Sequence, residues 1–132
     1  MVLVDTNVLV DVLQNDPQWS DWSISQMRAQ ARLNVLAINP VIYAEMSLSF
    51  STLEALEEVI GTLELAVHDM PRPALFLAAK AYAQYRRRGG TKQQVLPDFF
   101  IGAHAVVEGW PLLTRDASRF RTYFPTLKVL AP

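Results

Sequence analysis

The sequence predicts an α/β domain built around a parallel β-sheet. Short runs of consecutive aliphatic residues recur along the chain, and segments in which apolar residues have helical spacing separate them. Continuous aliphatic runs are typical of parallel strands that are buried on both faces, and strands that alternate with helices are joined by right-handed crossovers. A chain of 132 residues is expected to form a single domain, over residues 1–132, around one hydrophobic core.

The first half of the chain is expected to contain three strands and four helices. The apolar runs at residues 2–4, 35–38 and 63–67 predict the strands. The helices are expected over residues 8–13, over 18–32, from 40 to near 47–50, and from 51–54 to 60. Asn15-Asp16-Pro17 ends the first helix, Pro40 suits the first position of the third, and Gly61 is expected to end the fourth.

The second half is expected to begin with a long helix after Pro71 and Pro73, and this helix ends in the basic Arg86–Arg88 and two glycines. Ala74, Ala78, Ala81 and Tyr85 form its apolar stripe, which Leu75 and Tyr82 widen. Residues 91–96 are expected to be a loop. Residues 97–107 are apolar all round and predict a helix buried in the domain, with Gly109 as its end. Strands at 112–114 and 127–130 flank a short helical turn at 117–120.

Composition limits the classes of function that need consideration. The chain has no cysteine, which excludes disulfides, thiolate metal sites and cysteine nucleophiles. No apolar run reaches the roughly 20 residues of a membrane span, and no signal peptide is visible, so a soluble cytoplasmic protein is expected.

Charge divides the chain into two unequal halves. Residues 1–71 carry 10 acids and 2 bases, a net of −8, whereas residues 72–132 carry 3 acids and 10 bases, a net of +7. This asymmetry suggests a polyanionic partner for the basic part, unless folding mixes the two halves over the surface.

Four acids stand at the ends of predicted strands or within apolar helices: Asp5, Glu45, Asp98 and Asp116. The carboxyl ends of parallel strands are where α/β sheets place their ligands, so Asp5 and Asp116 are expected to share one crevice if their strands are neighbours. Each acid also has a structural alternative. Asp5, Asp98 and Asp116 could be helix N-caps, and Glu45 could be an exposed helical residue.

Gathering four carboxylates is unfavourable without a cation. Two carboxylates about 5 Å apart repel by roughly 3 kcal/mol at an effective dielectric constant of 20. Oxygen-only ligands select Mg²⁺ or Mn²⁺, and such an ion can polarise a phosphodiester and activate water without a protein nucleophile.

These residues and their order resemble the PIN domain, and more narrowly the VapC-type toxin ribonucleases of toxin–antitoxin pairs. The resemblance rests on Asp5-Thr6-Asn7 after a strand, Glu45 in the third helix, the segment from Pro97 to Ala105, and Leu113-Thr114-Arg115-Asp116. It covers the whole chain and all four acidic positions.

The resemblance implies a three-layer α/β/α fold with a five-stranded parallel sheet of order 3-2-1-4-5, and Mg²⁺- or Mn²⁺-dependent cleavage of RNA. Asp5 and Asp98 would be the main metal ligands, and Glu45 and Asp116 would complete the site. Thr6 and Asn7 would orient Asp5, and Thr114 would support the ligands or contact the substrate. A cognate antitoxin that covers an apolar groove and a homodimer are expected as partners.

Several arginine and histidine residues have a functional and a structural interpretation. Arg86, Arg87 and Arg88 could bind phosphates or only complement the end of a helix. Arg115 and Arg119 are expected near the site, where phosphate contact is plausible. A core role is favoured over a catalytic one for His104, and His68 is expected at the surface.

Two other functions remain open at this point. An aspartyl-phosphate phosphatase of the haloacid dehalogenase type needs a second aspartate two residues after the nucleophile, where this chain has Asn7. A receiver-like signalling module needs an acid pair after its first strand and a lysine after its last. Here Thr6 follows Asp5, and Lys128 begins a strand.

Overall fold

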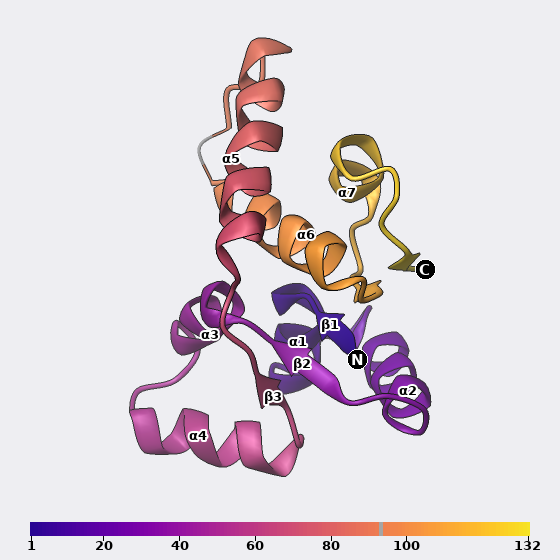
Figure 1. Ribbon diagram of the computed structural model, residues 1–132. Helices are drawn as coiled ribbons and strands as arrows, with labels where there is room; N and C mark the ends of the chain where they lie inside the picture. Colours follow the sequence, from indigo (N-terminus) through magenta and orange to yellow (C-terminus); the bar gives the residue numbers. More distant parts are fainter. Residues whose placement is uncertain (93) are drawn as a thin grey trace.

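The computed structural model describes residues 1–92 and 94–132, and in these residues it has five strands and seven helices (Figure 1). The strands are β1 (Val2–Val4), β2 (Leu36–Ile38), β3 (Ala66–Val67), β4 (Leu112–Leu113) and β5 (Val129–Leu130). The helices are α1 (Thr6–Leu13), α2 (Ser20–Ala31), α3 (Pro40–Ser47), α4 (Leu53–Thr62), α5 (Arg72–Arg87), α6 (Leu96–Glu108) and α7 (Ser118–Tyr123).

All strands are parallel and their order is β3-β2-β1-β4-β5, which confirms the expected order 3-2-1-4-5. The central strand is β1, in which Leu3 lies opposite Ala37 of β2 on one side and Leu112 of β4 on the other. These three side chains are fully buried. The chain therefore passes through the middle of the sheet first, and Asp5 directly follows the central strand.

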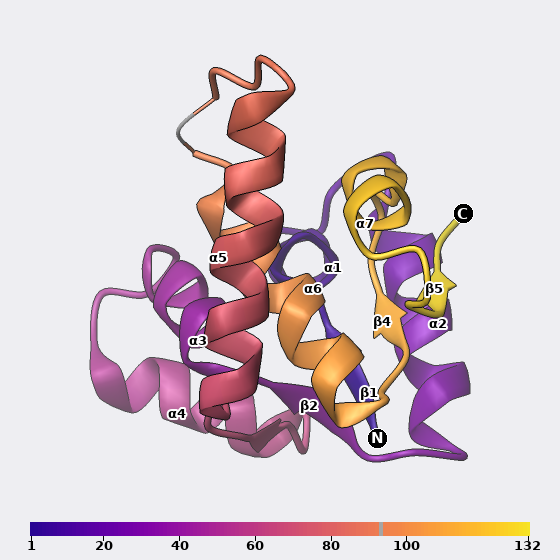
Figure 2. The same ribbon diagram turned by 45° about the horizontal axis from the view of Figure 1, so that its top comes forward.

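Helices cover both faces of the sheet, so the fold has the expected three layers. From β1 the chain steps to β2 and β3 in one direction, and from β3 it returns to β4 and β5 in the other. Right-handed crossovers therefore place α1 to α4 on one face and α5 to α7 on the opposite face. Figure 2 shows α5 and α6 side by side over the sheet.

The helix α6 is buried, as its apolar sequence predicts. Phe99 and the run from Ile101 to Ala105 are all buried, and Gly109 ends the helix with a φ of 72°. Gly102 allows the neighbouring helix to approach closely, because a Cβ at this position would lie 2.5 Å from the ring of Phe124.

Four expectations about local structure need correction or qualification. Gly61 does not end α4: the helix runs through it to Thr62, and the residue with positive φ is Glu64, at 53°. The strands expected at 63–67 and 127–130 pair over two residues each. Leu75 is exposed rather than part of the buried stripe of α5. The loop expected over 91–96 includes position 93, which lies outside the described residues, and Leu96 already belongs to α6.

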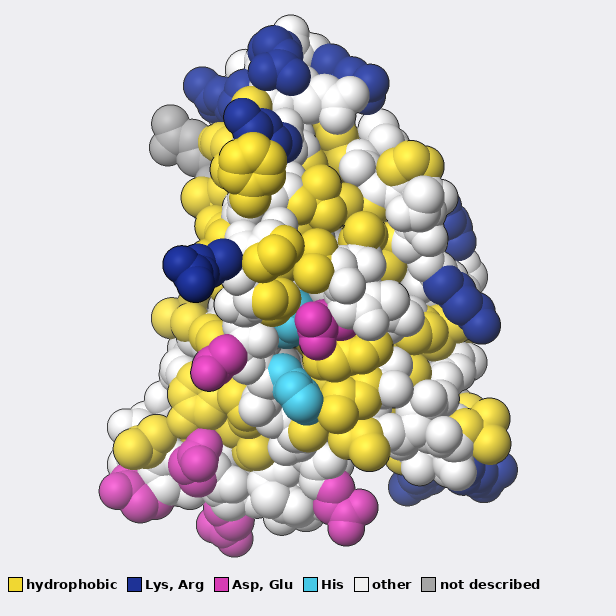
Figure 3. Space-filling view, in the orientation of Figure 1, with side chains coloured by type: hydrophobic (Ala, Val, Ile, Leu, Met, Phe, Trp, Pro, Cys, Tyr) yellow, Lys and Arg dark blue, Asp and Glu magenta, His cyan; other side chains and the backbone are white. Residues whose placement is uncertain are grey.

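Charged side chains of one kind gather in places on one face of the molecule. Acidic side chains gather at the lower left of this face, over α4, and Lys and Arg side chains gather at its upper end, over the end of α5, and also at its lower right (Figure 3). Among the described residues, no helix is long and apolar enough to cross a membrane.

Candidate active site

The four acids expected to form the site come from four segments that meet at the carboxyl edge of the sheet. Asp5 follows β1 and Asp116 lies three residues after β4, the neighbouring strand. Glu45 lies in α3, and Asp98 lies in the first turn of α6. Burial raises the pKa of Asp5 to about 7, and the charges of Asp98 and Glu45 add to this rise. The structure therefore brings these carboxylates within electrostatic reach of one another.

Asp5 has the most restricted environment of the four. Its side chain is buried, and its Oδ1 accepts a hydrogen bond of 2.7 Å from the backbone N–H of Thr6, which caps α1. Its Oδ2 accepts a hydrogen bond of 2.8 Å from the hydroxyl of Thr114. Both bonds favour the charged form, but they only partly offset the loss of hydration, so the pKa remains raised.

Thr114 is the centre of a small hydrogen-bonded network. This residue is fully buried, and its Oγ1 accepts hydrogen bonds from Asn7 Nδ2 at 3.3 Å and from the backbone N–H of Asp116 at 3.2 Å. Asn7 Oδ1 in turn accepts a hydrogen bond from the backbone N–H of Arg115. The network ties the end of β1 to the segment after β4, and it fixes the chain that carries Asp116.

Glu45 is held by the residue that follows Asp5. The hydroxyl of Thr6 donates a hydrogen bond of 2.7 Å to Glu45 Oε1. Partial burial raises the pKa of Glu45, the hydrogen bond from Thr6 opposes the rise, and the charge of Asp98 adds to it. The alternative that Glu45 is merely an exposed helical residue is therefore wrong.

Asp98 is paired with a cation of the same chain. Arg119 Nη1 in α7 donates a hydrogen bond of 2.6 Å to Asp98 Oδ2. Burial raises the pKa of Asp98, the bond and charge of Arg119 oppose this rise, and the charge of Asp116 adds to it. Asp98 and Arg119 line an open cleft of about 640 Å³ together with Asp116, Lys92, Gln94 and Val95.

Only one of the three proposed N-caps is a cap. Asp5 caps α1, but α6 is preceded by Val95 and α7 by Ala117, and neither end has a side-chain cap. Asp98 directs its carboxylate to Arg119, and Asp116 is exposed, with Ser118 Oγ 3.4 Å from its Oδ1. Capping therefore does not account for Asp98 or Asp116.

The predicted basic residues fall into separate places. Arg115 does not line the cleft described above, because its Nε forms an ion pair of 3.0 Å with the buried Asp11 and its guanidinium lies over Trp19. Arg86, Arg87 and Arg88 are exposed at the end of α5, where the guanidinium of Arg88 lies 5.4 Å from the centre of the Tyr123 ring.

Two residues near the site or its support were not singled out from the sequence. Lys92 lines the cleft, and its backbone N–H donates to the hydroxyl of Tyr85. Asp11 is the buried partner of Arg115, and its Oδ2 also accepts a hydrogen bond from Ser23. The isolated acid of an otherwise apolar helix face was the available signal for Asp11. The single base in the segment after the two glycines was the signal for Lys92.

His104 is a buried residue of α6, as favoured from the sequence. Asn39 Oδ1 caps α3 at Ile42, so Asn39 Nδ2 is the donor to His104 Nδ1 at 3.2 Å, and the ring proton is on Nε2. Burial lowers the pKa of His104. The imidazole is thus neutral at pH 7 and supports the start of α3. His68 is half-buried and lies edge-on to the ring of Trp110.

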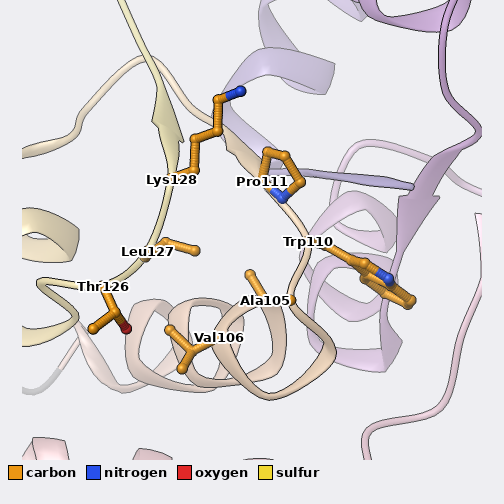
Figure 4. A pocket seen from close by; sticks show the side chains of 8 residues that line it. Ala105, Val106, Trp110, Pro111, Thr126, Leu127 and Lys128 are labelled. Carbon is orange, nitrogen blue, oxygen red and sulfur yellow. The ribbon is translucent and has the colours of Figure 1, made fainter.

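A second, smaller cavity of about 160 Å³ lies between the end of α6 and β5 (Figure 4). Its lining includes Pro111, which precedes β4, and Lys128, which precedes β5. It therefore lies at the amino edge of the sheet, opposite the acids. No acid or histidine is among the described residues that line it.

The chemistry of the four acids suits a hard divalent cation. Their ligand atoms are all carboxylate oxygens, and burial together with mutual repulsion destabilises the charged forms of Asp5 and Glu45. Within residues 1–92 and 94–132, however, no three His, Cys, Asp or Glu side chains are grouped closely enough to hold an ion in this arrangement.

Comparisons with known proteins concern the family and the fold of the chain. The sequence profile of the PIN domain matches residues 2–124 of the chain. No protein with curated annotation has a significantly similar sequence.

Among solved structures, chains of three complexes have a similar fold. A chain in the crystal structure of VapBC2 from Rickettsia felis bound to a promoter DNA fragment has a TM-score of 0.76 at 20% identity, over 100% of this chain and 99% of that one. One in DNA-bound VapBC from Salmonella typhimurium has a TM-score of 0.72 at 20% identity, over 98% and 96%. One in a toxin–antitoxin complex from Klebsiella pneumoniae has a TM-score of 0.67 at 19% identity, over 98% and 96%.

Proposed function

The chain belongs to the PIN domain family, and from this premise we propose that it is a divalent-metal-dependent endoribonuclease that acts as the toxin of a toxin–antitoxin pair. The observation that carries the proposal is the convergence of Asp5, Glu45, Asp98 and Asp116 at one edge of the sheet, where the first three have raised pKa values. Buried carboxylates with raised pKa values are typical of functional sites.

Mg²⁺ or Mn²⁺ would be held by Asp5 and Asp98, with Glu45 and Asp116 completing the set. When bound, such an ion polarises the phosphodiester and lowers the pKa of a water molecule. The chain's own residues supply orientation: Thr114 and the N–H of Thr6 hold Asp5, and the hydroxyl of Thr6 holds Glu45. Lys92 in the wall of the cleft supplies positive charge for a phosphate backbone.

The position of Lys128 argues against a receiver-like module. A lysine that contacts a phosphorylated aspartate must lie at the same edge of the sheet as that aspartate. Lys128 precedes β5, whereas Asp5 follows β1, and the two strands belong to one parallel sheet. The two side chains therefore start at opposite edges. Covalent labelling of the chain by acetyl phosphate would favour this rival or a phosphatase.

The partners are proposed to be an antitoxin protein and a second copy of the chain. A groove of about 250 Å³ at the α3–α4 connection is lined by Phe50, Leu53 and Leu56 among others, and Leu48 beside it is 89% exposed. An apolar helix of an antitoxin would cover such a surface. Phe76 on α5, 66% exposed, is a candidate for the dimer contact. Light scattering tests the dimer, which a monomeric mass at micromolar concentration would contradict.

Cleavage of single-stranded RNA by the purified chain tests the proposed activity. We expect cleavage with Mg²⁺ or Mn²⁺ and none with EDTA. Loss of a group that only hydrogen-bonds to a metal ligand lowers activity roughly 10- to 100-fold. Asp98→Asn should lower the cleavage rate by more than this, because Asp98 is proposed as a ligand itself. Glu58→Gln, at an exposed acid of α4, is the matched control and should cleave like the parent. An unchanged rate in Asp98→Asn, with both proteins folded, would contradict the proposed site.

A further inference from the structure

Arg119 is paired with Asp98, one of the two residues proposed as main ligands of the ion. Its Nη1 lies 2.6 Å from Asp98 Oδ2, which is a short charge-assisted hydrogen bond. The side chains of Arg119 and Asp98 are 24% and 31% exposed, so the pair lies in the wall of the cleft and not on the open surface. One oxygen of the carboxylate is therefore already bound by a cation that the chain itself supplies.

A second contact holds Arg119 independently of Asp98. Its guanidinium carbon lies 5.9 Å from the centre of the Tyr85 ring, in the range of a cation–π interaction. The Tyr85 ring is itself fixed, because it packs against Phe99 and Tyr123, and its hydroxyl accepts a hydrogen bond from the N–H of Lys92. If the bond to Asp98 opened, Arg119 would still have a partner at the edge of the cleft.

The acids do not form a closed ion site in this arrangement. Within the described residues, 1–92 and 94–132, no three acids or histidines are grouped closely enough for an ion, and Asp98, a proposed ligand, is paired with Arg119. A guanidinium and a divalent cation that compete for one carboxylate repel each other, so binding of the ion weakens the Asp98–Arg119 pair. By linkage, the pair weakens binding of the ion to the same extent.

We propose that Arg119 is an exchangeable counter-ion: it neutralises Asp98 in the metal-free protein, leaves when a divalent ion binds, and then contacts a phosphate of the substrate. This inference rests on the proposed nuclease function for its last step only. The cleft also contains Lys92, so the released guanidinium joins a second positive charge near the path of a phosphate backbone. The fork of the guanidinium matches the geometry of a phosphate.

Binding of Mn²⁺ alone, followed by the electron paramagnetic resonance signal of free Mn²⁺, tests the exchange without RNA. Arg119→Gln should bind Mn²⁺ roughly tenfold more tightly than the parent, because one charge-assisted hydrogen bond no longer competes. Arg119→Lys keeps a competing cation and should stay within about threefold of the parent. Arg121→Gln, at an exposed arginine of the same helix, should bind like the parent.

Cleavage and RNA binding then test the second step. Arg119→Gln should cleave RNA more slowly than the parent although it binds Mn²⁺ more tightly, and its RNA affinity should depend less on salt, by about 0.7 log units per log unit of salt. Equal or weaker Mn²⁺ binding by Arg119→Gln would overturn the exchange, as would a failure of both proteins to bind Mn²⁺. Tighter Mn²⁺ binding with no RNA cleavage by the parent would instead support the exchange and contradict the nuclease function.

Discussion

The two carboxylate oxygens of Asp5 have different partners, and each partner belongs to a different part of the molecule. Oδ1 caps α1 through the N–H of Thr6, and Oδ2 accepts a bond from Thr114, which follows β4. Asp5 thus links the start of the first helix to the neighbouring strand. Its burial has an energetic consequence, because its pKa of about 7 means that ionisation at neutral pH opposes folding.

Stability of the metal-free protein should therefore depend on Asp5. An unfolded aspartate has a pKa of about 3.9, so between roughly pH 4 and 7 the folded state binds more protons than the unfolded state, and stability falls as pH rises. Asp5→Asn removes this titration. The unfolding free energy of the parent minus that of the variant should fall by at most about 1.4 kcal/mol per pH unit in this window. Urea denaturation with EDTA at several pH values measures it.

Comparison with the variant also separates Asp5 from His104. Burial lowers the pKa of His104. Through this residue the protein therefore loses stability as the pH falls below the unfolded pKa of about 6.5, whereas through Asp5 it loses stability as the pH rises. His104 is common to both proteins and cancels in the difference. Asp98→Asn should give a smaller pH effect, because Arg119 already offsets that charge. A pH-independent difference between the parent and Asp5→Asn would show that Asp5 does not titrate in this range.

At the scale of elements, α6 connects the core to the site. Its first turn carries Asp98, its middle is buried, and Gly102 lies against Phe120 of α7 and Phe124 just beyond it. Because α7 also carries Arg119, the packing of α6 against α7 sets the distance between Asp98 and its counter-ion. The close packing that Gly102 allows between α6 and α7 therefore helps to position the Asp98–Arg119 pair.

Two Gly→Ala substitutions in helices should have opposite effects on stability. A Cβ at Gly102 would lie 2.5 Å from the Phe124 ring, so Gly102→Ala should destabilise by about 1–3 kcal/mol through overpacking. A Cβ at Gly61 of α4 would meet nothing within 4 Å, so Gly61→Ala should stabilise by about 0.5–1 kcal/mol. Urea denaturation measures both. A loss of stability in Gly61→Ala would contradict the helical conformation of that residue.

Sequence patterns predicted the elements well where an apolar run is bounded by residues that end a helix or strand. The central strand β1 and the helix α6 combine unbroken apolar runs with clear end signals, and both form where expected. The end of α4 predicted at Gly61 was wrong, because a helix can pass through an exposed glycine. Glu64 adopts the positive φ instead. The two strands at the sheet edges pair over two residues each and are shorter than their apolar runs.

For the site, the meeting of four acids at one edge followed from the parallel topology, but their pairings did not. Thr6 and Glu45 are 39 positions apart, and Arg115 and Asp11 are 104 apart. Such contacts depend on how segments far apart in the sequence pack against one another, which apolar periodicity does not specify. The same limit applies to Arg115, because its ion pair with the buried Asp11 does not follow from the sequence pattern.

At the scale of the whole molecule, the basic end of α5 and the acidic side chains over α4 lie at opposite ends of one face. The end of α5 carries three exposed arginines in a row, Arg86 to Arg88, and the acidic residues of α4 lie at the other end of this face (Figure 3). Lys92, which lines the cleft, follows Arg88 by four positions in the sequence. A phosphate backbone that reaches the acids from this side would meet positive charge first.

The salt dependence of RNA binding tests this path. If Arg86, Arg87 and Arg88 contact phosphates, replacing all three with glutamine should reduce the slope of log affinity against log salt by about 2, which is roughly 0.7 for each single-strand contact. Arg28→Gln with Arg32→Gln, at two exposed arginines at the end of α2, is the control and should leave the slope unchanged. Asp98→Asn is introduced into the parent, the triple variant and the control to prevent cleavage during the measurement. Equal slopes for the triple variant and the parent would restrict these arginines to the favourable interaction of positive charge with a helix C-terminus.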